Sequence, residues 1–296
     1  WRAFITNTIA DVEAGLIPMA RIDDAVTRIL RVKMRAGLFN RPVAASRLTG
    51  HAEALNADDL AREAVRKSIV LLKNENGALP LARGRKVLVI GASADSLSNQ
   101  TGGWSLTWQG TENVNADFGG GETLLTALRT ALGDANVTYS ADGSGVRVSD
   151  FDAVVAVLGE TPYAEYTGDV RFPKPVQHSA LYPADLAALR AVANKGVPVI
   201  SVLYSGRPAY ANDLINLSDA FVAAFLPGTE GDGIADVLVG GANDFTARLS
   251  FAWPGSACST GEHPGDVIQF ARGFGLSYSR PALTGPLPLP RTPAAC

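Results

Sequence analysis

Residues 154–158, VVAVL, form a continuous apolar run between Asp152 and Gly159. Hydrophobic side chains at every position, rather than at alternate positions, indicate a strand that is buried on both faces, as strands of parallel sheets are. Similar short runs recur along the chain, and most are separated by segments with helical periodicity. Strands that alternate with helices favour a mainly parallel sheet with helices on both faces. The sequence therefore predicts an α/β fold.

The expected elements follow from apolar periodicity and from the glycines, prolines and capping residues between the periodic segments. Strands are predicted at residues 69–73, 86–90, 137–140, 151–158, 199–204 and 220–225, with an extended piece at 248–251. Helices are predicted at residues 3–14, 22–36, 60–68, 122–132, 183–193, 210–214 and 233–239.

The predicted elements suggest how the chain divides. The first two helices have no strand partner and could not form a core alone, so we assign residues 1–40 to the end of a preceding domain. Residues 41–57 are polar and irregular and are expected to connect it to an α/β domain at 58–280, and the proline-rich residues 281–296 resemble a tail or linker. Because the chain starts with Trp1, inside a helix and without an initiator methionine, we expect a piece of a longer polypeptide. A missing signal segment then says nothing about location.

Composition argues against several classes of function. The formal net charge is −3 and there is no basic run, so nucleic acid is not expected as a partner. No apolar stretch approaches the roughly 18 residues that a membrane helix needs. The two cysteines and three histidines show no ligand spacing, so no metal site is expected. The junction GASADS at residues 91–96 lacks the later glycines of a dinucleotide-binding loop, so no cofactor is expected.

Two loops carry residues suited to chemistry. The first follows the 154–158 run and contains Glu160, Glu165 and Asp169. Ligands of open α/β sheets bind beyond the carboxyl ends of the strands, so these acids are candidates for carboxylate chemistry. The bland interpretation is a solvated acidic loop, and periodicity does not choose among the three acids.

The second loop, residues 99–121, places Trp104 and Trp108 among glycines and polar residues. Both indoles cannot be core, because the flanking polar backbone would be buried without partners. An exposed indole could stack on the C–H face of a sugar ring. We expect Trp104 to pack onto the domain and Trp108 to be the exposed platform.

Several segments together resemble glycoside hydrolase family 3, in its branch of exo-acting β-glucosidases and exo-1,3/1,4-β-glucanases. They are NTIADVEAG from residue 7, AVTRILRVKMRAGLF from 25, AREAVRKSIVLLKNENGALPL from 61, GGWSLTWQG from 102, GETPYAEYTGD from 159, LYSGRP from 203, AAFLPGTEGDGIADVL from 223 and GFGLSY from 273. The resemblance implies a six-stranded α/β sandwich domain, preceded in residues 1–40 by the last helices of a (β/α)8 barrel. The segment before GFGLSY is only loosely similar to the family pattern.

The resemblance also implies roles for individual residues. Glu165 matches the general acid/base, whereas Glu160 matches a glutamate that is not the proton donor. Trp108 matches the aromatic residue that helps to clamp the sugar, and we expect Trp104 and Tyr163 to contribute to substrate binding. The family's aspartate nucleophile would lie in the part of the barrel that is absent here. The implied location is secreted or periplasmic.

The implied chemistry is that of a retaining glycosidase acting on a β-glucan or β-glucoside oligosaccharide, with the barrel of the same polypeptide as partner. One carboxylate attacks the anomeric carbon while a protonated carboxyl group about 5–5.5 Å away protonates the leaving oxygen. Glu165 would then have to be partly protonated near neutral pH, with Tyr163 and Tyr166 as apolar surroundings once the barrel covers the loop. Without the barrel, we expect an ordinary solvated acid. The alternative function is a non-catalytic sugar-binding module that acts alone.

Overall fold

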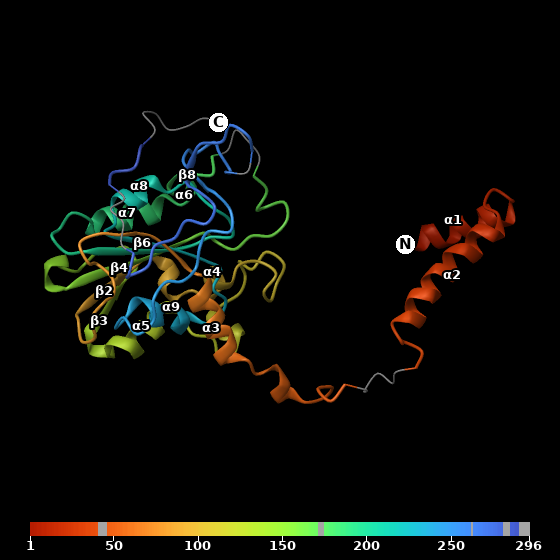
Figure 1. The fold of residues 1–296 in the computed structure, drawn as a ribbon, viewed down its shortest axis with the longest axis horizontal. Helices are drawn as coiled ribbons and strands as arrows, with labels where there is room; N and C mark the ends of the chain where they lie inside the picture. The colour runs from red at the N-terminus through yellow and green to blue at the C-terminus, as the bar shows by residue number, and fades with distance from the viewer. Residues whose placement is uncertain (41–45, 171–174, 262, 281–284, 290–296) are drawn as a thin grey trace. The chain divides into compact units, whose positions relative to one another are not determined.

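The computed structural model describes residues 1–40, 46–170, 175–261, 263–280 and 285–289. The chain forms two compact units, Trp1–Ala57 and Asp58–Cys296. The first unit contains α1 (Arg2–Glu13), α2 (Met19–Arg35) and the short 3-10 helix η1 (Ala52–Leu55), and none of these helices buries a residue (Figure 1). The predicted linker falls partly outside the described residues, at 41–45.

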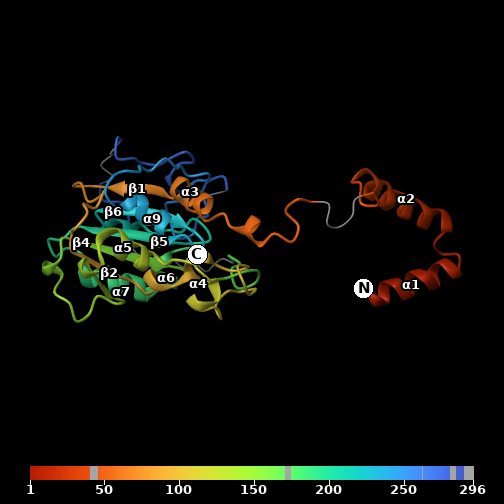
Figure 2. The same ribbon diagram turned by 90° about the horizontal axis from the view of Figure 1, so that it is seen from below.

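The second unit is built on one six-stranded sheet with the order β1-β6-β5-β4-β2-β3 (Figure 2). Its strands are β1 (Val70–Asn74), β2 (Val87–Ile90), β3 (Val137–Ser140), β4 (Ala153–Gly159), β5 (Val199–Tyr204) and β6 (Ala220–Phe225). Strands β2 to β6 are parallel, and β1 is an antiparallel edge strand paired with β6. All six predicted strands are present, and the prediction of a mainly parallel sheet is confirmed.

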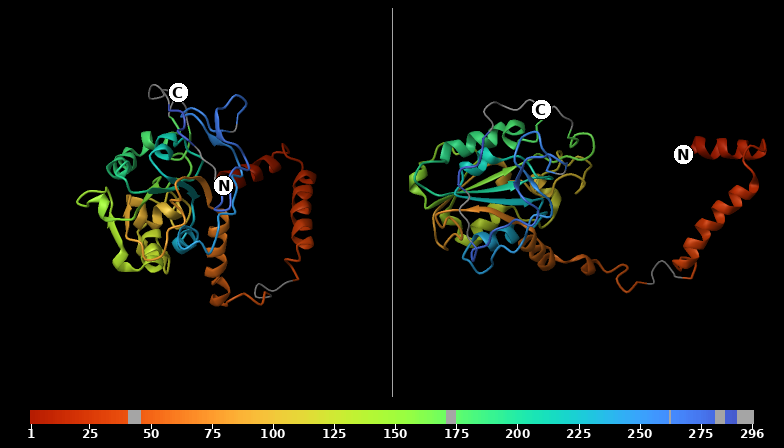
Figure 3. Two further views of the ribbon diagram at one scale, coloured as in Figure 1. Left: turned by 60° about the vertical axis from the view of Figure 1, so that its left-hand side comes forward. Right: turned by 45° about the horizontal axis from the view of Figure 1, so that its top comes forward.

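Helices cover both faces of this sheet (Figure 3). In Figure 1, α7 and α8 lie on one side of the strands, and α5 and α9 lie on the other. The helices of the second unit are α3 (Asp58–Ser68), α4 (Leu97–Thr101), α5 (Leu124–Leu132), α6 (His178–Leu181), α7 (Pro183–Val192), α8 (Asn212–Asn216) and α9 (Gly231–Leu238). Between them lie the 3-10 helices η2 (Ala92–Asp95), η3 (Asn115–Phe118), η4 (Asp134–Asn136) and η5 (Val148–Asp150). The short α4 and α6 were not predicted.

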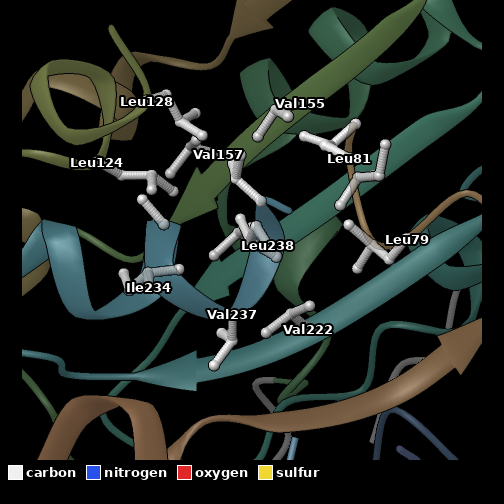
Figure 4. Packing of buried hydrophobic residues seen from close by; sticks show 14 of the residues in the cluster. Leu79, Leu81, Leu124, Leu128, Val155, Val157, Val222, Ile234, Val237 and Leu238 are labelled. Carbon is white, nitrogen blue, oxygen red and sulfur yellow. The ribbon is translucent and has the colours of Figure 1, made fainter. Parts of the chain in front are cut away.

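Strand β4 shows why the central sequence is apolar at every position. Val155 and Val157 belong to the core cluster that includes Leu124 of α5 and Ile234 of α9 (Figure 4). The alternate residues of β4 belong to the opposite cluster, with Leu189 of α7. All seven residues of β4 are buried, because each face of the sheet has its own layer of helices.

The glycine after β2 has a steric cause. Gly91 has φ +94°, and a Cβ there would lie 2.0 Å from the carbonyl oxygen of Val157. Only glycine therefore fits where β2 leaves the sheet beside β4.

The end of the chain differs in detail from the prediction. The extended piece at 248–251 is irregular, although Leu249 exchanges two backbone hydrogen bonds with Gly273 and Phe274. An unpredicted two-stranded ladder joins β7 (Trp253–Pro254) to β8 (Ile268–Phe270).

Part of the predicted tail packs onto the sandwich. In the described residues 285–289, Leu287 is buried and its backbone exchanges two hydrogen bonds with the side chain of Asn216 in α8. These residues therefore do not behave as a free linker. The rest of the predicted tail, at 281–284 and 290–296, lies outside the described residues. No helix among the residues that the structure describes is long and apolar enough to cross a membrane.

Candidate active site

The two loops singled out in the sequence meet beyond the carboxyl ends of β4 and β5. The acidic loop starts at Glu160, directly after β4, and the backbone N–H of Glu160 donates to the carbonyl of Tyr204 at the end of β5 (3.0 Å). The tryptophan loop follows α4. The topology thus brings together segments that are about 60 residues apart, at the sheet edge where ligands of parallel α/β folds bind.

Glu165 is exposed and is held by the tryptophan loop through its carboxylate. The indole N–H of Trp108 donates to Oε2 of Glu165 at 2.7 Å, and that of Trp104 donates to the same oxygen at 3.0 Å. Chiefly the Trp108 hydrogen bond, with smaller help from Trp104, lowers the pKa of Glu165, while the charge of Asp169 acts in the opposite direction. Glu165 is therefore exposed to solvent as expected, but it is not an ordinary acid, because the indole hydrogen bonds stabilise its carboxylate. The shift also runs opposite to the raised pKa that a general acid needs near neutral pH.

The expectation that Trp104 packs onto the domain is wrong, whereas Trp108 is exposed as expected, although less so than Trp104. Trp104, predicted to plug the loop onto the domain, is 67% exposed, whereas Trp108, predicted to be the open platform, is 46% exposed. The backbone of Trp104 has φ +58°, in the left-handed region that is uncommon for a bulky residue. Both rings are nevertheless accessible, and Trp108 also makes an edge-to-face contact with Tyr166 at 6.0 Å. The indoles of Trp104 and Trp108 thus meet at the Glu165 carboxylate, and Tyr166 lies against Trp108.

Gln109 fixes the tryptophan loop to the backbone of the acidic loop. Its side-chain amide donates to the carbonyl of Glu165 (3.0 Å) and accepts from the N–H of Ala164 (2.8 Å). This amide is already engaged with backbone, which the sequence did not reveal.

Glu160 has a different environment from Glu165. It is 6% exposed, and its Oε2 accepts from the hydroxyl of Tyr163 (2.7 Å) and from the backbone N–H of Gly206 (2.9 Å). Arg207 donates to the same hydroxyl (2.8 Å), donates to the carbonyl of Gly168, and lies over the Tyr163 ring at 4.4 Å. Burial first, and the charge of Glu160 second, raise the pKa of Tyr163. This network anchors the acidic loop at both ends.

The hydroxyl of Tyr163 is therefore hydrogen-bonded within the domain, to Glu160 and Arg207. A role of Tyr163 in substrate binding stays a prediction. Gly206 is needed beside it, because a Cβ there would lie 2.7 Å from the hydroxyl oxygen. A pocket of about 330 Å³ opens next to this network and is lined by Glu160, Tyr163, Tyr182 and Arg207 among others. Arg207 was missed as a site residue, although it stands in the LYSGRP segment.

A buried pair supports the end of β4 from behind. His178 is fully buried, and its Nε2 lies 2.7 Å from Oδ2 of Asp185, which also accepts from the N–H of Gly159 (3.0 Å). The pair therefore fixes the residue before Glu160. The sequence does not reveal this pair, because it does not show that α6 and α7 fold back onto β4.

The residues that the structure describes contain no group of three or more His, Cys, Asp or Glu side chains arranged to hold a metal ion. The carboxylates of the site are held instead by N–H and O–H donors of the chain.

Comparisons with known proteins agree with this architecture. A family model described as "Glycosyl hydrolase family 3 C-terminal domain" matches residues 69–278. The lysosomal beta glucosidase of Dictyostelium discoideum is 32% identical over 90% of this chain, and the periplasmic beta-glucosidase of Salmonella typhimurium is 29% identical over 83%. Each match covers 35% of the relative, so the chain spans about a third of these proteins.

Solved structures give the same result. The exo-1,3/1,4-beta-glucanase from a Pseudoalteromonas species is 38% identical, with a TM-score of 0.86 over 99% of this chain and 37% of that one. A beta-glucosidase mutant from Listeria innocua, solved with laminaribiose, is 25% identical, with a TM-score of 0.71 over 91% of this chain and 40% of that one. Because the family model covers most of the sequence, the chain belongs to glycoside hydrolase family 3 and carries the C-terminal domain of that family.

Proposed function

We propose that this chain is the C-terminal portion of a retaining, exo-acting β-glucan or β-glucoside hydrolase, in which Glu165 is the general acid/base. The observation that carries the proposal is the environment of Glu165. It is an exposed carboxylate beyond the carboxyl ends of the strands, and the indoles of two accessible tryptophans, Trp104 and Trp108, donate to it. Glu160, the other glutamate of the loop, is buried and engaged by Tyr163 and Gly206.

In the proposed reaction, protonated Glu165 gives its proton to the glycosidic oxygen while a carboxylate of the barrel attacks the anomeric carbon. The C–O bond to the leaving group breaks with the electron pair on that oxygen, and a glycosyl ester forms. Glu165, now a carboxylate, then takes a proton from water while the water oxygen attacks the anomeric carbon. The ester bond breaks and the barrel carboxylate is released. The flat rings of Trp104 and Trp108 would flank the leaving sugar.

The barrel has to change the titration of Glu165. In this chain the indole hydrogen bonds favour the carboxylate. Covering the loop would remove water and bring the nucleophilic carboxylate close, and both effects raise the pKa of an acid. The proposed partners are therefore the barrel of the same polypeptide and a β-glucan or β-glucoside oligosaccharide, without a cofactor. The proposed location is secreted or periplasmic.

The test uses the full polypeptide that includes the barrel. Glu165→Ala should slow hydrolysis of an alkyl glucoside by about 10²–10⁴-fold, because its alkoxide needs a proton to leave. The dinitrophenolate group of a dinitrophenyl glucoside leaves without a proton. With this substrate the covalent ester should therefore accumulate, and added azide should restore turnover. Glu160→Ala should lower the rate of hydrolysis of both substrates alike, and azide should not restore it. Azide rescue of the Glu160 variant alone would contradict the assignment of Glu165.

The isolated chain should not hydrolyse aryl β-glucosides, because the proposed nucleophile lies in the barrel. Turnover by the purified chain that Glu165→Gln abolishes would contradict this division of roles.

A non-catalytic sugar-binding module is the second candidate, and the exposed trio Trp104, Trp108 and Tyr166 is the observation that favours it. Calorimetry with laminari-oligosaccharides distinguishes the two. Tight binding by the isolated chain that Trp108→Ala abolishes, together with full hydrolysis by the Glu165→Ala polypeptide, would favour the module.

A further inference from the structure

The two indole hydrogen bonds of Glu165 end on one and the same oxygen. Trp104 and Trp108 both donate to Oε2, at 3.0 and 2.7 Å, and neither indole donates to Oε1. The ring centroids lie 6.3 Å apart with their planes at 45°, so the two N–H groups converge on this atom from different directions. The carboxylate therefore has two chemically different oxygens.

The backbone holds this convergence in place. Trp104 keeps φ +58°, which is uncommon for a bulky residue, and its N–H donates to the carbonyl of Trp108 (3.0 Å). Gly103 lies so close to the acidic loop that a Cβ would meet the carbonyl oxygen of Tyr163 at 2.3 Å. With the Gln109 amide on the backbone of residues 164 and 165, the two loops are fixed against each other before any substrate arrives.

We propose that Trp104 and Trp108 are positioning residues that hold Oε2 of Glu165, so that Oε1 is the oxygen that carries and delivers the proton. This inference rests on the proposed role of Glu165 as acid/base. It gives the tryptophans a task in addition to contact with a sugar.

The reason lies in which oxygen of a carboxyl group can donate a hydrogen bond and which can only accept one. A protonated carboxyl group has one O–H oxygen and one carbonyl oxygen that remains a good acceptor. An indole N–H can only donate, so an oxygen that faces two indoles stays the acceptor in both protonation states. The proton is thereby assigned to Oε1. The lowered pKa of Glu165 agrees with this arrangement, because the same donors bind the anion more strongly than the acid. Asp169 is the charged group that opposes them.

The test is NMR of the indole N–H groups in the 296-residue chain, which needs neither the barrel nor turnover. We expect the Trp104 and Trp108 resonances to titrate together, with one common midpoint below the ordinary glutamate pKa. The indole of Trp253 is buried, with no hydrogen-bond partner among the described residues, and should not follow this titration. Trp104→Phe removes one N–H and keeps a bulky ring, so it should raise the midpoint that Trp108 reports.

Variants at neutral pH make the result independent of acid stability. The indole proton shifts should be furthest downfield with the Glu165 carboxylate, intermediate in Glu165→Gln, whose carbonyl mimics the acid, and furthest upfield in Glu165→Ala. Glu112→Gln is the control, because Glu112 is an exposed acid of the tryptophan loop whose side chain accepts a hydrogen bond from Thr111 rather than from an indole. It should leave both indoles unchanged.

Three outcomes would overturn the proposal: indoles that do not titrate while Trp253 reports a folded core, two different midpoints, or equal shifts in Glu165→Gln and Glu165→Ala. Equal shifts would mean that the indoles do not stay hydrogen-bonded to Oε2 when the Glu165 carboxyl group is neutral. None of these depends on catalysis. Normal hydrolysis by a full polypeptide that carries Glu165→Ala would instead contradict the proposed function. It would not bear on the indole hydrogen bonds of the unsubstituted chain.

Discussion

Replacing each glutamate of the acidic loop by alanine should separate a structural acid from a functional one. Glu160 is 6% exposed and accepts two hydrogen bonds, from Tyr163 and from Gly206. Hydrogen bonds to a charged group contribute about 1.5–3 kcal/mol each, so Glu160→Ala should lower the free energy of unfolding by about 3–6 kcal/mol. Glu165 is exposed, and Glu165→Ala should change it by no more than about 0.5 kcal/mol, as surface substitutions do.

The assay is urea unfolding at neutral pH, followed by circular dichroism, with the slope against urea compared between variants. Glu160→Gln keeps one acceptor oxygen and should fall between the wild type and Glu160→Ala. Equal unfolding midpoints for Glu160→Ala and Glu165→Ala would refute the reasoning, because the buried network would then contribute nothing to stability. A larger loss in Glu165→Ala would show that the indole contacts, rather than the Arg207 network, hold the loop.

Three further predictions concern the scaffold, and urea unfolding tests all of them. Gly91→Ala should prevent normal folding, since its Cβ would lie 2.0 Å from a carbonyl oxygen of β4. Gly84 also has a positive φ but open space around it, so Gly84→Ala should lower the free energy of unfolding by only about 1–2 kcal/mol. Equal losses would contradict the steric argument. Burial raises the pKa of Tyr210 to about 12, so its contribution to stability is complete below pH ~10 and is lost as the pH rises through about 12. Tyr210→Phe should flatten that decline, and an unchanged pH profile would contradict it. Leu287→Ala should cost about 2–4 kcal/mol because the side chain is buried, while Leu289→Ala, at an exposed position, should be nearly neutral; equal costs would show that the tail does not pack.

The sheet was predictable because its strands are marked by residue type. In β4 every side chain faces one of two helix layers, so the sequence there is apolar without interruption. The β7–β8 ladder was not predictable, because its pairing joins Trp253 to Phe270 across a polar segment that has no alternation. Such a ladder depends on tertiary contacts rather than on local preference.

The site was predictable only in part. Glu165 and the tryptophans could be singled out from their loops and from the family resemblance. Their mutual hydrogen bonds could not, because these depend on the φ of Trp104 and on how two loops about 60 residues apart approach each other. The same holds for Arg207, whose guanidinium meets Tyr163 only after β4 and β5 lie side by side.

The antiparallel edge strand has a consequence for synthesis. Leu71 of β1 pairs with Val222 of β6, about 150 residues later in the chain. At about 5–20 residues per second, a ribosome needs roughly 8–30 s to deliver that partner. Throughout this interval the segment 69–72, which is entirely apolar, has no strand to pair with and is open to other nascent chains. Lys67 and Lys73 flank the segment, and charges in such positions oppose aggregation of a waiting strand.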